Sequence, residues 1–168
     1  EVMVYLTIVS SDNIHAAEIA AINATSLALR LSSVPFQTTT AAVRVGRIDG
    51  RFVINPTIPD MNKSDLDLIV AGTRHGINMV ESGAREVDEA TMIEALRTAH
   101  HAIVEAIDDM DAFINKAAKP KFAFTAPELP EDVRRNMRAH VEPLFEALVS
   151  AADKDKTAFF YDEAAIIE

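Results

Sequence analysis

Two aspartates stand at a spacing that could bind a metal ion. Asp65 and Asp67 lie two positions apart in the run DLDLIVAGT. Side chains two apart on a strand point to the same face, so the pair could hold a divalent cation. Because no third ligand accompanies them, we favour a solvated strand face or carboxylates that anchor a loop. An unrelated small-molecule enzyme that uses this pair with a histidine is one alternative.

Histidines and acidic residues recur along one predicted helix. His100 and His101 are adjacent and diverge by about 100° around a helix, so they cannot easily share a metal. His101 and Glu105 have one-turn spacing, but without a third ligand we favour helix-surface or interface packing. Four acidic residues also cluster there: Glu105, Asp108, Asp109 and Asp111. They lack the glycine turn and alternating spacing of a calcium loop, which favours a solvated helix face.

The composition narrows the class of protein. The 168 residues are 49% hydrophobic, enough for one core with a small appendage. The absence of cysteine excludes disulfides and thiolate zinc sites and fits a reducing compartment. No apolar run approaches the roughly 18 residues of a membrane span, and no signal segment opens the chain. The net charge of −10 disfavours a protein that binds a nucleic-acid duplex through phosphate contacts alone. This negative charge lies in residues 57–168, which hold 12 basic and 22 acidic residues.

The first third of the chain predicts strands around a helix. Residues 2–9 are continuously apolar and β-branched, which predicts a strand buried on both faces. This run follows Glu1 directly, as in a chain entered mid-fold. Residues 18–31 carry apolar side chains near helical spacing and predict a core helix. Asp49 and Gly50 then supply the positive φ angles of a tight hairpin turn between two strands.

A second strand pair and a long helix follow. Residues 65–73 and 77–84 predict two strands joined by a short turn. Residues 88–118 carry an apolar stripe at helical spacing, which predicts a helix with one buried side. Elements in this order indicate an α+β domain.

The end of the chain predicts a small helical part. Three prolines mark an extended linker: Pro120, Pro127 and Pro130. A helix is predicted over residues 131–151, with a kink or break at Pro143. Its arginines, Arg134, Arg135 and Arg138, are expected to pair with Glu131 and Glu142. The predicted domains are residues 1–118 and an all-helical part, 119–168.

Several motifs in a fixed order resemble those of a known family. They are INATSLALRLSSVPF, AAVRVGRIDGRFVINP, LDLIVAGT, a strand ending MVES, and AAKPKFAF. Together they resemble the rear half of the first RNase PH-type domain in the polynucleotide phosphorylase family, followed by its helical linker domain. The implied fold is an α+β, RNase PH-like (ribosomal S5 domain 2-like) half-domain with a mixed sheet and packed helices, before a small all-α domain.

The resemblance also implies a function. The family uses phosphate to remove nucleoside diphosphates from the 3′ end of RNA, in a homotrimer with a central channel. The chain would lack the front of the first domain and the whole second domain. Its implied role is a non-catalytic scaffold and channel wall of an exoribonuclease that degrades mRNA. Single-stranded RNA, the homotrimer and RNA-degradosome proteins are the implied partners, with no membrane, in the bacterial cytoplasm or an organelle.

The family's phosphate site can be located by alignment on SLAL and VPF. In the active domain, a serine run binds phosphate through hydroxyl and backbone N–H groups. The matching positions here are Ala16, Ala17 and Glu18. Alanine donates no side-chain hydrogen bond, and a carboxylate repels phosphate. Since no lysine offsets the negative charge, we expect this site to be silent.

The family's catalytic strand can be located by alignment on DLDLIVAGT. Its two aspartates and its lysine fall on Met61, Asp67 and Ile69. A lone carboxylate is a poor site for a divalent metal, so no metal is expected in this chain. Mg²⁺ and inorganic phosphate are expected in the second RNase PH-type domain. A stand-alone, non-catalytic ring subunit of an exosome-like RNA-degrading complex is the alternative.

The hairpin arginines are the best candidates in the sequence for contact with RNA. Arg44, Arg47 and Arg51 lie on the hairpin in the neutral part of the chain. Arginine side chains bind phosphate oxygens. Because arginines are also ordinary on exposed hairpins, a surface position without RNA contact is the alternative.

Overall fold

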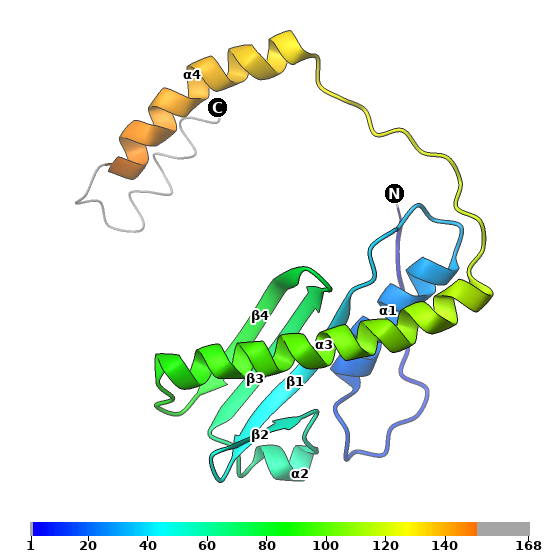
Figure 1. Cartoon of the computed structure of the whole chain (residues 1–168), viewed down its shortest axis with the longest axis vertical. Coiled ribbons are helices and arrows are strands. Elements are labelled where there is room, and N and C mark those ends of the chain that lie inside the picture. The colour runs from blue at the N-terminus through cyan, green and yellow to red at the C-terminus, as the bar shows by residue number, and fades with distance from the viewer. Residues whose placement is uncertain (1, 151–168) are drawn as a thin grey trace. The chain divides into compact units, whose positions relative to one another are not determined.

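The computed structural model describes residues 2–150 and separates into two compact units, Glu1–Ala123 and Phe124–Glu168. The first unit holds a four-stranded sheet with helices, and the second holds one described helix (Figure 1). The remainder of the predicted all-helical part, residues 151–168, lies outside the described residues. No helix within residues 2–150 is both long and apolar enough to cross a bilayer.

The sheet has the strand order β2-β1-β3-β4. Its strands are β1 (Ala41–Ile48), β2 (Arg51–Ile54), β3 (Leu66–Thr73) and β4 (Gly76–Ala84). Every neighbouring pair in this described sheet is antiparallel, so the predicted mixed sheet is wrong. Tight turns explain two of these pairs, β1–β2 and β3–β4, because a tight turn can join only antiparallel neighbours.

Both predicted hairpins are present. Asp49 and Gly50 have φ angles of 50° and 74°, the positive values that a type I′ turn requires at its two central positions. The turn between β3 and β4 is equally short. A Cβ on Gly72 would lie 2.7 Å from the carbonyl oxygen of Gly76, so β3 and β4 approach each other here at a distance that only glycine permits.

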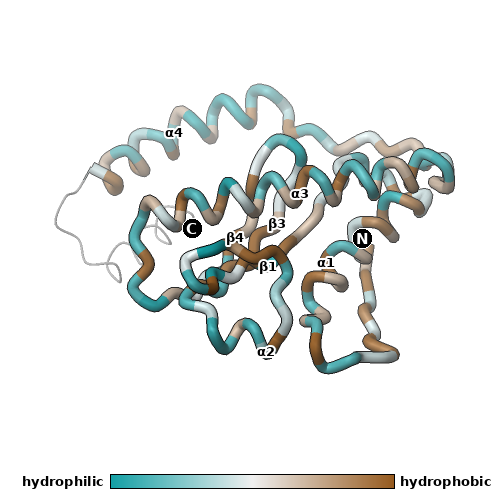
Figure 2. Tube along the Cα trace, turned by 60° about the horizontal axis from the view of Figure 1, so that its bottom comes forward, coloured by the Kyte–Doolittle hydropathy of each residue, from teal (hydrophilic) through white to brown (hydrophobic). Residues whose placement is uncertain are grey.

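Helix α3 (Glu89–Ala117) lies across one face of the sheet, as Figure 1 shows. Asp88 caps its first turn by accepting a hydrogen bond from the Thr91 N–H at 2.7 Å. The apolar stripe of α3 and alternate positions of β1 and β3 form the core, which appears as brown segments of β1 and β3 in Figure 2. The buried core residues are Ala41, Val43, Val45, Leu66, Leu68, Val70, Ala95, Ala99, Ile103 and Ile107.

Helix α1 (Ala17–Leu31) is attached to β1 by side-chain hydrogen bonds. The Asn23 amide accepts from the Ala42 N–H at 2.7 Å and donates to the Ala42 carbonyl oxygen at 3.1 Å. The Ser26 hydroxyl accepts from the Thr40 N–H at 2.9 Å. These side chains satisfy backbone groups of the β1 edge that β2, with four residues, does not reach.

Residues 2–9 form no strand, although their composition predicts one. Their apolar side chains are exposed, with 92% exposure at Val9. None of the four described strands pairs with this segment. A strand exists only through hydrogen bonds to a neighbouring strand, so β-propensity alone leaves an extended segment.

Two helices differ from the sequence-based expectation. A single helical turn, α2 (Ile58–Met61), connects β2 to β3 and is capped by the Thr57 side chain. In the second unit, α4 (Glu131–Ser150) continues through Pro143, so the break that was one of the two predicted outcomes is wrong, while the kink stays a prediction. Residue 143 cannot donate a hydrogen bond to Ala139, and its ring crowds the Ala139 carbonyl group.

Two of the predicted ion pairs of α4 are present at its surface, while Arg135 has no ion pair among residues 2–150. Arg134 Nη1 lies 3.7 Å from Glu131 Oε2, and Arg138 Nε lies 3.7 Å from Glu142 Oε1. Both pairs join neighbouring turns of the helix and contribute little to stability, because water screens them.

Candidate functional site

The guanidinium of Arg44 binds two of the predicted site residues at once. From β1, its Nε and Nη2 donate to the two carboxylate oxygens of Asp67 at 2.7 and 2.5 Å. Its Nη1 donates to Glu18 Oε1 at 2.7 Å. The Arg44 side chain is 18% exposed, compared with 42% for Asp67 and 48% for Glu18. The hydrogen bond to Asp67, reinforced by the nearby carboxylate charges, raises the pKa of Arg44 above its ordinary value.

The backbone of Arg44 is also held in place. Asn55, the first residue after β2, accepts a hydrogen bond from the Arg44 N–H at 2.9 Å through its side chain. Its own N–H donates to the Arg44 carbonyl oxygen at 2.7 Å. Asn55 has a φ of 49°, in the left-handed region that asparagine tolerates better than most residues. Asn55 therefore extends the β1–β2 ladder by one step and fixes Arg44 on both sides.

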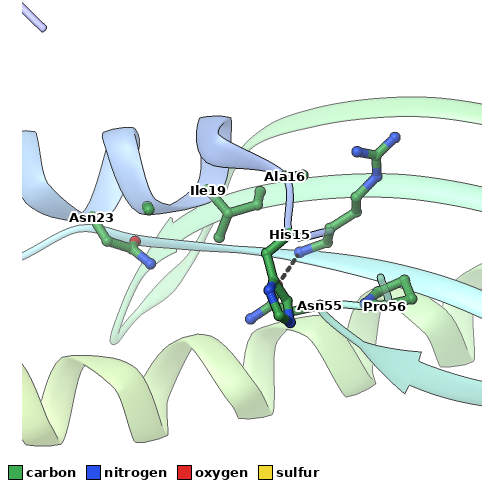
Figure 3. A pocket seen from close by; sticks show the side chains of 8 residues that line it. His15, Ala16, Ile19, Asn23, Asn55 and Pro56 are labelled. Carbon is green, nitrogen blue, oxygen red and sulfur yellow. Dashed lines mark hydrogen bonds between the residues drawn. The ribbon is translucent and has the colours of Figure 1, made fainter. Parts of the chain in front are cut away.

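The predicted phosphate-site positions lie at the N-terminal end of α1. Ala16 is the N-cap and makes no side-chain capping bond, Ala17 begins the helix, and Glu18 binds Arg44. Ala16 lines a hollow of about 280 Å³ together with Arg44 and Asn55. Figure 3 shows Ala16 on the helix side of this hollow and Asn55 on the side of the loop after β2.

The predicted catalytic-strand positions border two further hollows. Met61, from α2, and Asp67 line one of about 500 Å³. Asp67 and Ile69 line another of about 630 Å³. Arg44 lines both of these hollows and also the one beside Ala16. The structure thus brings the two predicted sets of positions together around a single arginine.

The site holds a cation that sequence alignment did not point to. No lysine stands at the matching strand position, which is Ile69, but Arg44 lies between Glu18 and Asp67. Sequence spacing could not reveal it, because Arg44 lies 23 positions from Asp67 and 26 from Glu18. Asn55 was missed for the same reason. The one signal in the sequence was the predicted hairpin, which places Arg44 on a strand.

The ion pairs limit what the site can do. Three of the five guanidinium N–H donors are used by carboxylates, and both oxygens of Asp67 accept from Arg44. A magnesium ion needs carboxylate oxygens that are free to coordinate it. The residues present at this site therefore do not fit Mg²⁺.

The three hairpin arginines do not form one patch. Arg44 and Arg47 stand three apart on β1 and so point to opposite faces of the sheet. Arg47 Nη1 donates to Asp65 Oδ2 at 2.9 Å. Arg51 is exposed at the start of β2 and has no ion pair among residues 2–150. RNA contact by these arginines stays a prediction, and Arg51 is the one whose charge is left open to solvent.

The acidic cluster of α3 is partly neutralised by other elements. Arg74 Nη2, in the turn between β3 and β4, lies 2.7 Å from Asp108 Oδ1 and 3.4 Å from Asp111 Oδ2. The Thr39 hydroxyl donates to Asp111 Oδ1 at 2.6 Å. Two members of the cluster therefore tie α3 to the ends of the strands instead of facing only solvent.

The adjacent histidines have separate contacts. His100 Nε2 lies 3.1 Å from the carbonyl oxygen of Thr73. His101 Nδ1 lies 3.8 Å from Glu105 Oε1 at the helix surface. These contacts are the helix packing that the spacing predicts. Across residues 2–150, no group of three histidine, aspartate or glutamate side chains is arranged to hold a metal.

Comparison with known proteins shows which sequences the chain resembles. The model of the 3′ exoribonuclease family, domain 2, matches residues 38–102, which span the whole sheet and the start of α3. The polyribonucleotide nucleotidyltransferase of Exiguobacterium sibiricum is 38% identical over 158 residues, 94% of this chain and 21% of the relative. The enzyme of the same name from Thermus thermophilus is 44% identical over 133 residues, 79% of this chain and 19% of the relative. This chain is a homologue of one segment of polyribonucleotide nucleotidyltransferase.

The match to polyribonucleotide nucleotidyltransferase confirms the resemblance carried by the sequence motifs. The relative from Bdellovibrio bacteriovorus extends it to 98% of the chain, at 37% identity. The chain spans about a fifth of the length of these relatives, from 19% to 24%. A solved structure, rice (Oryza sativa) Rrp46, superimposes with a TM-score of 0.55 over 61% of this chain and 50% of its own, at 15% identity. At that identity the likeness shows the fold alone.

Proposed function

We propose that the chain is part of a phosphorolytic 3′-to-5′ exoribonuclease and that its own RNase PH-type half-domain is catalytically silent. In this proposal residues 1–118 support the active domain and form part of the channel wall of a homotrimeric ring. Residues 119–168 are the helical linker domain. The enzyme degrades mRNA to nucleoside diphosphates in the bacterial cytoplasm, with RNA-degradosome proteins as further partners.

The observation that carries the proposed silence is the binding of Asp67 and Glu18 by Arg44. Phosphorolysis depends on positioning inorganic phosphate and on stabilising developing negative charge. In this site the available cation is already bound by two carboxylates, and Ala16 and Ala17 offer no hydroxyl groups. The chemistry, with its Mg²⁺ and phosphate, is therefore assigned to the second RNase PH-type domain.

A stand-alone subunit of an exosome-like complex is the weaker candidate. The curated relatives that match 79–98% of this chain are named polyribonucleotide nucleotidyltransferase. Their match extends beyond the sheet and α3 into the segment that follows. A ring subunit made of a single RNase PH-type domain would not need that segment.

Two assays test the proposal. The isolated chain, supplied with polyadenylate, inorganic phosphate and Mg²⁺, is expected to release no nucleoside diphosphate. A chimera in which this chain replaces the matching segment of the Thermus thermophilus relative is expected to be active. In that chimera Asp67→Asn should lower kcat by less than about tenfold. Removal of a catalytic carboxylate would instead lower kcat by a factor on the order of 10⁴.

The contrary results are equally clear. Turnover by the isolated chain that Asp67→Ala abolishes would assign catalysis to this half-domain. An inactive but trimeric and folded chimera would remove the proposed supporting role. A loss near 10⁴ in the Asp67→Asn chimera, with its melting temperature unchanged, would make Asp67 a catalytic group.

A further inference from the structure

The C-terminal end of α1 is closed by a residue about 90 positions later in the chain. Lys121 Nζ donates to three carbonyl oxygens, those of Leu29 at 3.0 Å, Arg30 at 2.8 Å and Ser32 at 2.7 Å. The last carbonyls of a helix have no partner inside it, and they carry the negative end of the helix dipole. An ammonium group with three donors matches both needs.

The backbone on either side of Lys121 is bound to the same helix end. The Lys119 N–H donates to the Leu31 carbonyl oxygen at 2.9 Å, and the Phe122 N–H donates to the Ser33 carbonyl oxygen at 2.9 Å. Five hydrogen bonds therefore hold residues 119–122 against the end of α1.

We propose that residues 119–122 are a latch that fixes the point where the chain leaves the first unit, and that Lys121 closes it. Helix α3 ends at Ala117 and Ala118 is its hydrogen-bonded C-cap, so without the latch the chain would be free from residue 119 onward. With the latch closed, the free linker is limited to residues 123–130, before α4. Opening it adds four residues, about 14 Å of reach, to the tether of the second unit.

The charge and surroundings of Lys121 identify it as the closing residue. Lys119, two positions earlier, makes no side-chain hydrogen bond or ion pair within residues 2–150, so only its backbone takes part. Desolvation and the neighbouring positive charge of Arg30 lower the pKa of Lys121 below its ordinary value. The Arg30 guanidinium is directed elsewhere, to Thr39 and to the Phe36 carbonyl oxygen.

Hydrogen exchange on the full chain tests the latch. In Lys121→Met, the amides of Lys119 and Phe122 should exchange at least about tenfold faster, since their opening no longer breaks the Nζ bonds. Lys119→Met is the matched control, because it removes the lysine that has no described side-chain contact. It should leave the Phe122 amide unchanged. Equal exchange in Lys121→Met and the wild type, or equal acceleration in both variants, would overturn the proposal.

The change in reach has its own measurement. The chain has no cysteine, so spin labels can be placed at Ala28→Cys and Arg135→Cys, both exposed positions, one in each unit. The distance distribution should broaden in Lys121→Met and stay the same in Lys119→Met. An unbroadened distribution in both would overturn the proposal.

A readout on the wild type does not depend on folding of a variant. The ammonium protons of Lys121 should be observable by NMR because their hydrogen bonds slow exchange with water, while those of Lys119 should not be. If neither or both ammonium groups are observed, the assignment of Lys121 as the closing residue fails.

Discussion

Arg44 and Asp67 are diagonal neighbours on β1 and β3, since Arg44 stands opposite Ile69 and Asp67 stands opposite Gly46. Diagonal positions in an antiparallel pair are about 7–8 Å apart, a gap that a long arginine side chain spans. The ion pair therefore depends on strand register. A shift by one residue would move Arg44 to the other face of the sheet.

Arg44→Met is expected to lower the free energy of unfolding by about 1–3 kcal/mol. The variant leaves Asp67 and Glu18 without their partner, and the effect is limited because both carboxylates are nearly half exposed and screened by water. Urea unfolding followed by circular dichroism measures it. Arg51→Met, on the exposed edge of the same hairpin, is the control and should change the value by less than about 0.5 kcal/mol. Equal losses in the two variants would contradict a special role of Arg44.

Gly72→Ala is expected to destabilise the β3–β4 hairpin by about 1–3 kcal/mol. The new Cβ would lie 2.7 Å from the Gly76 carbonyl oxygen and 3.2 Å from the Ile77 Cα, and backbone atoms cannot easily move away. Gly83→Ala is the matched control in the same strand pair, because its Cβ would meet nothing within 4 Å. It should be neutral or stabilising by up to about 1 kcal/mol. Thermal unfolding of both variants checks the contrast, and a stable Gly72→Ala would disprove the close approach.

Ile103→Ala is expected to lower the free energy of unfolding by about 2–5 kcal/mol. The Ile103 side chain is fully buried between α3 and the sheet, so its truncation leaves a cavity. Ile93→Ala, on the same helix but 51% exposed, should cost less than about 1 kcal/mol. Chemical denaturation gives both values. Similar losses at the two positions would mean that α3 presents a different face to the sheet.

Asp88→Ala is expected to lower the melting temperature at neutral pH, because Asp88 caps α3. Hydrogen bonds from Thr91 lower the pKa of Asp88 below its ordinary value. The stabilisation is therefore present above the unfolded pKa of about 3.9 and is lost as the pH falls through the folded pKa.

Melting curves from neutral to acidic pH measure this effect. The difference between wild type and Asp88→Ala should narrow on acidification. Asp88→Asn caps the helix without titrating, so its difference from Asp88→Ala should not narrow in the same way. If the difference in melting temperature between the wild type and Asp88→Ala stays constant with pH, the charge of Asp88 does not contribute to the cap.

Local signals in the sequence were enough for most of the fold. The hairpin at Asp49 and Gly50, the strands at 65–73 and 77–84 and helix α3 follow from periodicity and turn chemistry, which act over a few residues. Residues 2–9 have the local pattern of a strand but none of the described strands as a partner. Pro143 has the pattern of a break, but α4 continues through it.

The candidate site was predicted less completely, for a physical reason. Alignment to the family located Ala16, Glu18 and Asp67, and the structure places them near one another. The arginine that joins them comes from a third segment, and its placement depends on the β1–β3 register. Electrostatic balance is a property of groups that meet in space, so the absence of a lysine at position 69 did not reveal that Arg44 pairs with Asp67 and Glu18.

The amide of Asn23, the hydroxyl of Ser26 and the amide of Asn55 occupy the outer side of β1 where β2 is absent. They cover the backbone groups through which a foreign peptide would otherwise extend the sheet. Within the described sheet, β4 is then the long edge strand that is open to strand addition, because it has nine residues and contains neither lysine nor proline. Self-association of the chain at high concentration should therefore begin at β4.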